Sequence, residues 1–134
     1  MRTILIAAFA LPILFVLDLL WIGLLASDFY HTQLGALLAP DVVWAPALVF
    51  YVLYAIALSF FAITPAVNEQ SLKKATLLGA FLGLTAYIGY DLTNWATLIG
   101  WPPLVSIVDL AWGIVVSTIA SVGAYLIATK IAHL

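Results

Sequence analysis

The sequence predicts an all-α integral membrane protein, a four-helix bundle with a short interfacial helix between spans one and two. The first observation is composition, because 66% of the 134 residues are hydrophobic and 7% are charged. A soluble domain carries about 25% charged side chains, so lipid must cover most of this surface. The second is that four apolar runs, each long enough to cross a bilayer, are separated by short polar links. The third is that every lysine and arginine falls on one side of that arrangement.

Composition also limits the classes of function. The length suits a single domain, residues 1–134. The chain has no cysteine, which excludes disulfides and thiolate metal sites. Its four basic residues form no cluster, so no nucleic-acid partner is expected. No stretch has the spacing of a metal-ligand or cofactor motif, and we therefore expect neither a metal nor a cofactor.

The first apolar run predicts a membrane span over residues 3–26. It is longer than the apolar core of a signal peptide, about 7–15 residues, so we expect it to be retained. Residues 27–41 are too polar to cross the bilayer. We expect a short helix lying in the membrane interface here, with an apolar face formed by Phe29, Leu34, Leu37 and Leu38. Asp41 is placed to cap the helix that follows.

Three further spans are predicted over residues 42–64, 72–98 and 104–129. Ser71 is placed to cap the third span. At about 40 Å the third span is longer than the hydrocarbon core. It must therefore tilt, protrude or end early, near Asn94.

The basic residues predict the orientation of the bundle. Arg2, Lys73, Lys74 and Lys130 lie at the N-terminus, in the link between spans two and three, and at the C-terminus. All three segments fall on the same side of a four-span protein. Because positively charged loops stay in the cytoplasm, we expect both termini there.

Three aspartates lie inside the apolar spans, where a carboxylate is costly and usually functional. Counted from the outer ends of their spans, the depths are about 12 Å for Asp18, about 10 Å for Asp91 and about 8 Å for Asp109. Polar groups in a membrane face the bundle interior, so the three carboxyl groups should converge in the outer half of the bilayer.

Aromatic side chains accompany each aspartate at helical spacing, which places them on the same helix faces. Small residues every four positions also bring spans three and four together, from Ala75 to Gly83 and from Gly113 to Ser121. We therefore expect one binding site lined by Asp18, Trp21, Tyr51, Tyr54, Tyr87, Asp91, Asn94, Trp95, Asp109 and Trp112.

Several of these residues have a plainer interpretation. Ser106 and Asp109 have the spacing of a capping box, which would place Asp109 at a helix end. Asp91 would lie near water if the third span ended early. The remaining tryptophans, Trp44 and Trp101, suit a belt at the membrane interface. His31 is typical of a solvated loop histidine.

Four segments resemble the domain-of-unknown-function family 2177, small four-helix membrane proteins predicted in bacteria. They are Asp18-Leu-Leu-Trp-Ile-Gly23, Phe50-Tyr-Val-Leu-Tyr54, Tyr87-Ile-Gly-Tyr-Asp-Leu-Thr-Asn94 and Asp109-Leu-Ala-Trp-Gly113. The likeness covers nearly the whole chain. It implies a protein of the bacterial inner (plasma) membrane and assigns no activity.

Three functions fit these residues. The first is binding or transport of a small cationic or amphiphilic molecule in an acidic, aromatic-lined pocket, since aromatic faces attract cations. The second is a membrane enzyme acting on a lipid or isoprenoid, with Asp18 and Asp91 as catalytic acid and base. The third is an accessory subunit whose polar residues only fix helix packing. The partners expected are the lipid bilayer and a small-molecule or lipid ligand, and assembly into a homo-oligomer is left open.

Overall fold

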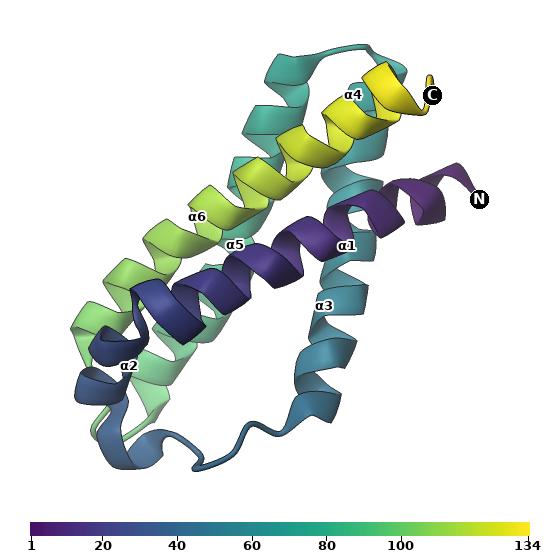
Figure 1. Cartoon of the computed structure of the whole chain (residues 1–134). Coiled ribbons are helices and arrows are strands. Elements are labelled where there is room, and N and C mark those ends of the chain that lie inside the picture. The colour runs from purple at the N-terminus through teal and green to yellow at the C-terminus, as the bar shows by residue number, and fades with distance from the viewer.

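The computed structural model describes residues 1–134 and is built of helices alone (Figure 1). Four helical segments are long and apolar enough to cross a membrane: Arg2–Leu25, Trp44–Asn68, Leu72–Thr97 and Pro103–Ile131. The predicted all-α membrane bundle, with a short helix between spans one and two, is confirmed. The protein is a multi-pass membrane protein.

Three of the four spans, the first, second and fourth, contain a π-helical turn. The first consists of α1 (Arg2–Leu20) and η1 (Trp21–Leu25). The short helix α2 (Ser27–Leu34) and the 3-10 turn η2 (Gly35–Leu37) follow it. The second span consists of α3 (Trp44–Leu58), the π-helical η3 (Ser59–Ile63) and α4 (Thr64–Asn68). The third span is α5 (Leu72–Thr97), and the fourth is α6 (Pro103–Leu126) with the π-helical η4 (Ile127–Ile131).

Of three predictions about helix ends, one is confirmed and two are wrong. The Ser71 side chain accepts a hydrogen bond from the Lys74 N–H at 3.1 Å, as predicted for a cap. Asp41 is not a cap, because α3 begins only at Trp44 and has no side-chain cap. Pro46 in the first turn lacks an N–H, which reduces the need for one. The third span continues unbroken to Thr97, so the proposed early end is wrong.

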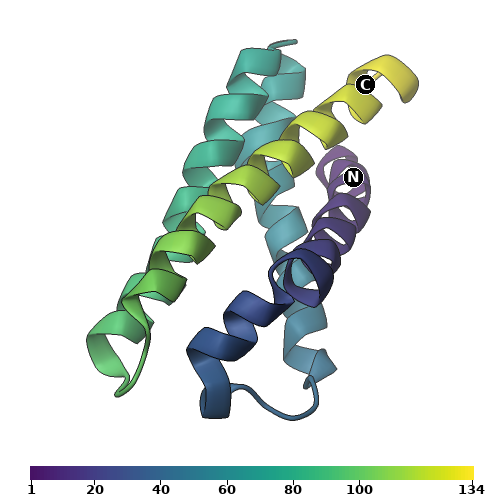
Figure 2. The same ribbon diagram turned by 60° about the vertical axis from the view of Figure 1, so that its left-hand side comes forward.

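The two chain termini and α4 lie at one end of the bundle, and α2 lies at the other with the turn between α5 and α6 (Figure 1). At the first end, the Arg2 guanidinium donates to the Asn68 side-chain oxygen at 2.8 Å. We call the two halves of the bundle the terminal half and the α2 half. Figure 2 shows α5 and α6 side by side along most of their length.

Small residues let α5 and α6 pack closely, as the sequence predicts. Gly79 and Gly83 of α5 and Gly113, Ser117 and Ser121 of α6 are buried between the two helices. A methyl group added at Gly83 would overlap the carbonyl oxygen of Gly113, and one at Gly113 would overlap the ring of Tyr87.

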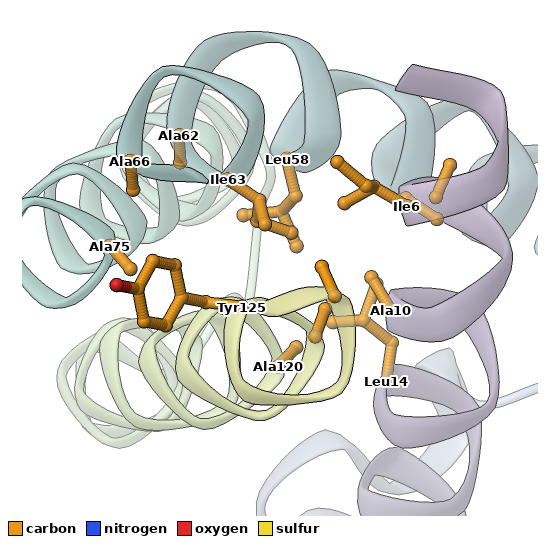
Figure 3. Close-up of a cluster of buried hydrophobic side chains, with 14 of the residues drawn as sticks. Ile6, Ala10, Leu14, Leu58, Ala62, Ile63, Ala66, Ala75, Ala120 and Tyr125 are labelled. Carbon is orange, nitrogen blue, oxygen red and sulfur yellow. The ribbon is translucent and has the colours of Figure 1, made fainter. Parts of the chain in front are cut away.

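The apolar core occupies the terminal half (Figure 3). There α1 and the second span meet α6 through buried Ile6, Leu14, Leu58 and Ile63. In this half α5 packs against η3, whereas α3 packs mainly against α1. The second span therefore closes the bundle in the terminal half, and α3 diverges from α5 in the α2 half (Figure 1).

We expect Gly83→Ala to lower the free energy of unfolding by about 1–3 kcal/mol, because overpacking forces α5 and α6 apart. Gly89→Ala, in the same helix, is the matched control. Nothing lies within 4 Å of a methyl group at that position, and alanine favours the helix by about 1 kcal/mol. Melting in detergent compares the two variants. Equal melting temperatures would contradict this close packing.

Candidate functional site

A cavity of about 510 Å³ lies in the α2 half of the bundle. Its wall is drawn from all four spans, from α2, and from the turn before α6. The wall contains two carboxyl groups and six aromatic side chains: Asp18, Asp109, Tyr30, Phe50, Tyr51, Tyr87, Tyr90 and Trp101. Most of the other lining residues are aliphatic. The space is therefore apolar with two acidic groups in its wall.

Asp18 is held by two neutral hydrogen-bond donors. It is buried in α1, one helical turn before the π-helical η1. The Trp112 indole N–H of α6 donates to its Oδ1 at 2.7 Å. The Tyr51 hydroxyl of α3 donates to its Oδ2 at 2.9 Å. A carboxylate that accepts two such bonds is fixed in direction while its charge is left uncompensated.

Asp109 is held by a hydrogen bond from a tyrosine of α2. The Tyr30 hydroxyl donates to Asp109 Oδ1 at 2.9 Å and accepts a bond from the Trp21 indole N–H at 3.1 Å. Burial, followed by the nearby charge of Asp109, raises the pKa of Tyr30 above its usual value. Tyr30 therefore stays neutral and remains a donor.

Two stacked indoles join these hydrogen-bonded groups. Trp21 and Trp112 lie parallel, with ring centres 4.6 Å apart and an angle of 8° between their planes. Trp112 donates to Asp18, and Trp21 donates to the tyrosine that holds Asp109. One connected aromatic unit thus positions both carboxyl groups of the cavity wall.

Asp91 lies behind Asp109 and does not line the cavity. Its side chain is fully buried, and no N–H or O–H of the chain reaches either carboxyl oxygen. The polar side chain within hydrogen-bonding reach is the carboxyl group of Asp109. Asp18 and Asp91, the pair predicted for acid–base chemistry, make no hydrogen bond to each other: Asp18 accepts from Trp112 and Tyr51, and Asp91 has no donor.

One of the plainer interpretations is wrong. Ser106 does not cap α6, which begins at Pro103 without a side-chain cap. The Ser106 hydroxyl instead donates to the backbone carbonyl oxygen of Asp91 at 2.8 Å and accepts from the Trp101 indole at 3.0 Å. Asp109 consequently sits in the second turn of α6, inside the bundle. Trp101, which the sequence suggested for an interfacial belt, is buried at the cavity wall in the turn between α5 and α6.

Basic side chains are absent from the site. The single salt bridge of the protein joins Lys74 to Glu69, at the start of α5 in the terminal half. His31 of α2 is exposed and contacts Ser27. The buried carboxyl groups of Asp18, Asp91 and Asp109 have no lysine, arginine or histidine partner.

The structure gathers most of the predicted site residues but not all. Asp18, Tyr51, Tyr87 and Asp109 line the cavity, and Trp21 and Trp112 hold its carboxyl groups. The Tyr54 hydroxyl is bonded instead to Ser117 at 2.6 Å. Asn94 interacts with Tyr90, and Trp95 is exposed; neither lines the cavity.

Sequence reasoning missed four aromatic residues of the cavity wall, Tyr30, Phe50, Tyr90 and Trp101, of which Tyr30 is the one that binds a carboxyl group. The predicted apolar face of the interfacial helix comprised Phe29, Leu34, Leu37 and Leu38, whereas Tyr30, Leu34 and Leu38 line the cavity. Tyr30 and Leu34 are four apart and share one face of α2, whereas Leu38 is extended and follows η2. That spacing is visible in the sequence and could have identified the face of α2 that packs on the bundle.

Comparison with known proteins assigns the family. The sequence profile of a family described as "Predicted membrane protein (DUF2177)" matches residues 3–126. A search of curated proteins and of solved structures finds no match. The profile covers nearly the whole chain, including most of every span and each of the buried aspartates described above. The chain therefore belongs to the DUF2177 family of predicted membrane proteins.

Proposed function

We propose that this protein binds a small cationic amphiphile in the cavity of the α2 half, as a binding or transport protein. The observation that carries the proposal is an aromatic-lined cavity with two buried carboxyl groups and no basic partner. A ligand cation would supply the missing positive charge. Tyrosine and tryptophan faces attract cations through their quadrupoles, most strongly where water is excluded.

The surroundings of the cavity support entry from the bilayer. Phe50 of α3 and Tyr90 of α5 both line the cavity and are both exposed on the outer surface. The two helices that carry them, α3 and α5, diverge in this half of the bundle (Figure 1). A ligand with a hydrocarbon tail can place its cationic end near Asp18 and Asp109 and extend its tail past Phe50 and Tyr90 into the lipids. The apolar lining suits such an amphiphile better than a fully hydrated ion.

We further propose that the protein lies in the inner membrane of a bacterium with both termini in the cytoplasm. Arg2, Lys73, Lys74 and Lys130 all belong to segments at the terminal end of the bundle. The positive-inside rule then places that end in the cytoplasm. The cavity would lie in the outer half of the bilayer.

Equilibrium dialysis tests the ligand class. The probe is radiolabelled dodecyltrimethylammonium, added to the full chain in dodecyl maltoside micelles, with empty micelles as the blank. We expect saturable binding of one probe per chain. Dodecanol and dodecanoate have the same tail without the positive charge, so they should displace the probe poorly. Tetramethylammonium, which lacks the tail, should bind more weakly. Equal displacement by dodecanol would contradict a site that recognises the cation.

A further inference from the structure

We infer that Asp91 and Asp109 together form a proton-binding site, and that a cation bound beside Asp109 releases the proton. The first half rests on the geometry of the two aspartates alone. The second half, the coupling between proton and ligand, rests on the proposed function.

No donor reaches the carboxyl oxygens of Asp91. Its side chain is fully buried, and neither of its oxygens meets an N–H or O–H. Neighbouring donors are already used: Tyr30 donates to Asp109, Ser106 to the backbone oxygen of Asp91, and Trp101 to Ser106. An unpartnered, buried polar group costs free energy unless a hydrogen bond is supplied.

The groups that face the pair come from each neighbouring element. Tyr30 approaches from α2 and Tyr90 from α5. Asp18 of α1 also interacts with Asp109, and Tyr51 of α3 donates to Asp18. These groups are neutral or acidic, so no side chain supplies a positive charge to balance two ionised carboxylates.

One proton between the two carboxyl groups satisfies this geometry. The Asp91 carboxylic acid then donates its O–H to the Asp109 carboxylate, and the pair carries one negative charge. An O–H to carboxylate bond is among the strong hydrogen bonds in proteins. Asp109 still accepts from Tyr30 and still lines the cavity. The proton site therefore has direct access to the ligand site.

Ligand binding replaces the shared proton with the positive charge of the ligand. When the cation of the ligand lies beside Asp109, its charge stabilises the fully ionised pair, and the proton leaves to solvent. The net charge of the site is the same before and after. Because linkage is reciprocal, protons must then oppose ligand binding. If one proton is released for each ligand bound, the Kd should fall about tenfold for each unit of rising pH in that range.

Infrared difference spectroscopy tests the shared proton without any ligand. We expect a carboxylic acid band in the ligand-free full chain that shifts in D₂O and disappears in Asp91→Asn. The asparagine amide can donate to Asp109 in place of the acid O–H, so this variant should stay folded. Asp41→Asn removes an exposed carboxyl group outside the cavity and should keep the band. Absence of the band from the wild-type protein would overturn the proton site.

The dodecyltrimethylammonium titration tests the coupling. In the wild-type protein we expect the Kd to fall with rising pH, and the probe to diminish the acid band. In Asp91→Asn the Kd should be independent of pH.

A wild-type Kd that is also independent of pH would overturn the coupling and leave the proposed function standing. A Kd that depends on Na⁺ at constant pH, and not on pH, would overturn the coupling to protons in favour of exchange with a metal cation. No binding at any pH would overturn both the proposed function and the coupling, whereas the band tests the shared proton by itself.

Discussion

Replacing Asp18 with asparagine is expected to weaken dodecyltrimethylammonium binding at least about a hundredfold while the bundle stays folded. Asparagine keeps the hydrogen bonds of the parent side chain, because its oxygen can accept from the Trp112 indole and its amide can donate to the Tyr51 hydroxyl. What it removes is the negative charge. Truncating one partner of a buried charge pair typically costs about 2–5 kcal/mol of binding free energy, and a hundredfold change in Kd is about 2.7 kcal/mol.

Two variants separate the charge of Asp18 from its structural role. Asp18→Leu leaves the Trp112 indole N–H without an acceptor, so it should lower stability by about 1–3 kcal/mol. Asp41→Asn removes a negative charge from the exposed segment before α3 and should change neither binding nor melting. Melting in maltoside micelles and equilibrium dialysis together measure both effects. An Asp18→Asn protein that unfolds or does not insert would assign the carboxylate to architecture, and the proposed site would have to be withdrawn.

The spans were predictable because the hydrocarbon core imposes a length on any helix that crosses it. A run of about 20 apolar residues is needed, and the first span, Arg2–Leu25, lies within one residue of the predicted 3–26. The packing of α5 on α6 was predictable for a related reason. Without a hydrophobic force between helices in lipid, close approach depends on small residues, and Gly79, Gly83 and Gly113 mark it.

The partners of the buried aspartates were only partly predictable, because they depend on how the chain folds back. Estimated depth predicted that the aspartates would converge, but helical spacing associated Trp112 with Asp109, whereas Trp112 and Tyr51 both donate to Asp18. The position of α2 depends instead on the π-helical η1 and on the turn at Gly35, where φ is +51°. Hydrophobic periodicity detects neither feature, so the bond from Tyr30 to Asp109 could not be derived from it.

The end of the third span shows a second limit. Trp95 follows Asp91 by four residues, which predicted that both would face the site. The turn after α5 instead brings Trp101 back over this region, where it bonds to Ser106 and packs edge-on against Tyr90 at 5.9 Å. Trp101 thus takes the position that Trp95 was expected to hold, and Trp95 is exposed. Spacing along one helix does not show that a residue of a neighbouring loop, here Trp101, occupies the place expected for a residue of the helix.

Filling the cavity should abolish binding without altering any carboxyl group. Ala86 of α5 lines the cavity wall and is half-buried. In Ala86→Trp the indole would occupy the space that the ligand needs, so we expect dodecyltrimethylammonium binding to fall at least about a hundredfold, about 2.7 kcal/mol. Stability should be kept or raised by about 0.5–2 kcal/mol, because a filled cavity adds apolar contact.

The adjacent residue provides the matched control for this variant. Thr85 precedes Ala86 in α5 and is exposed on the outer surface of the helix. Thr85→Trp adds the same indole one position away, outside the cavity, and should leave both binding and melting near the parent values. Together with Asp18→Asn, the pair distinguishes where the ligand lies from what attracts it. If Ala86→Trp bound the probe like the parent while Asp18→Asn did not, the carboxylate would act on a ligand held outside the bundle. The cavity would then have no part in binding, since an occupied space cannot also hold a ligand.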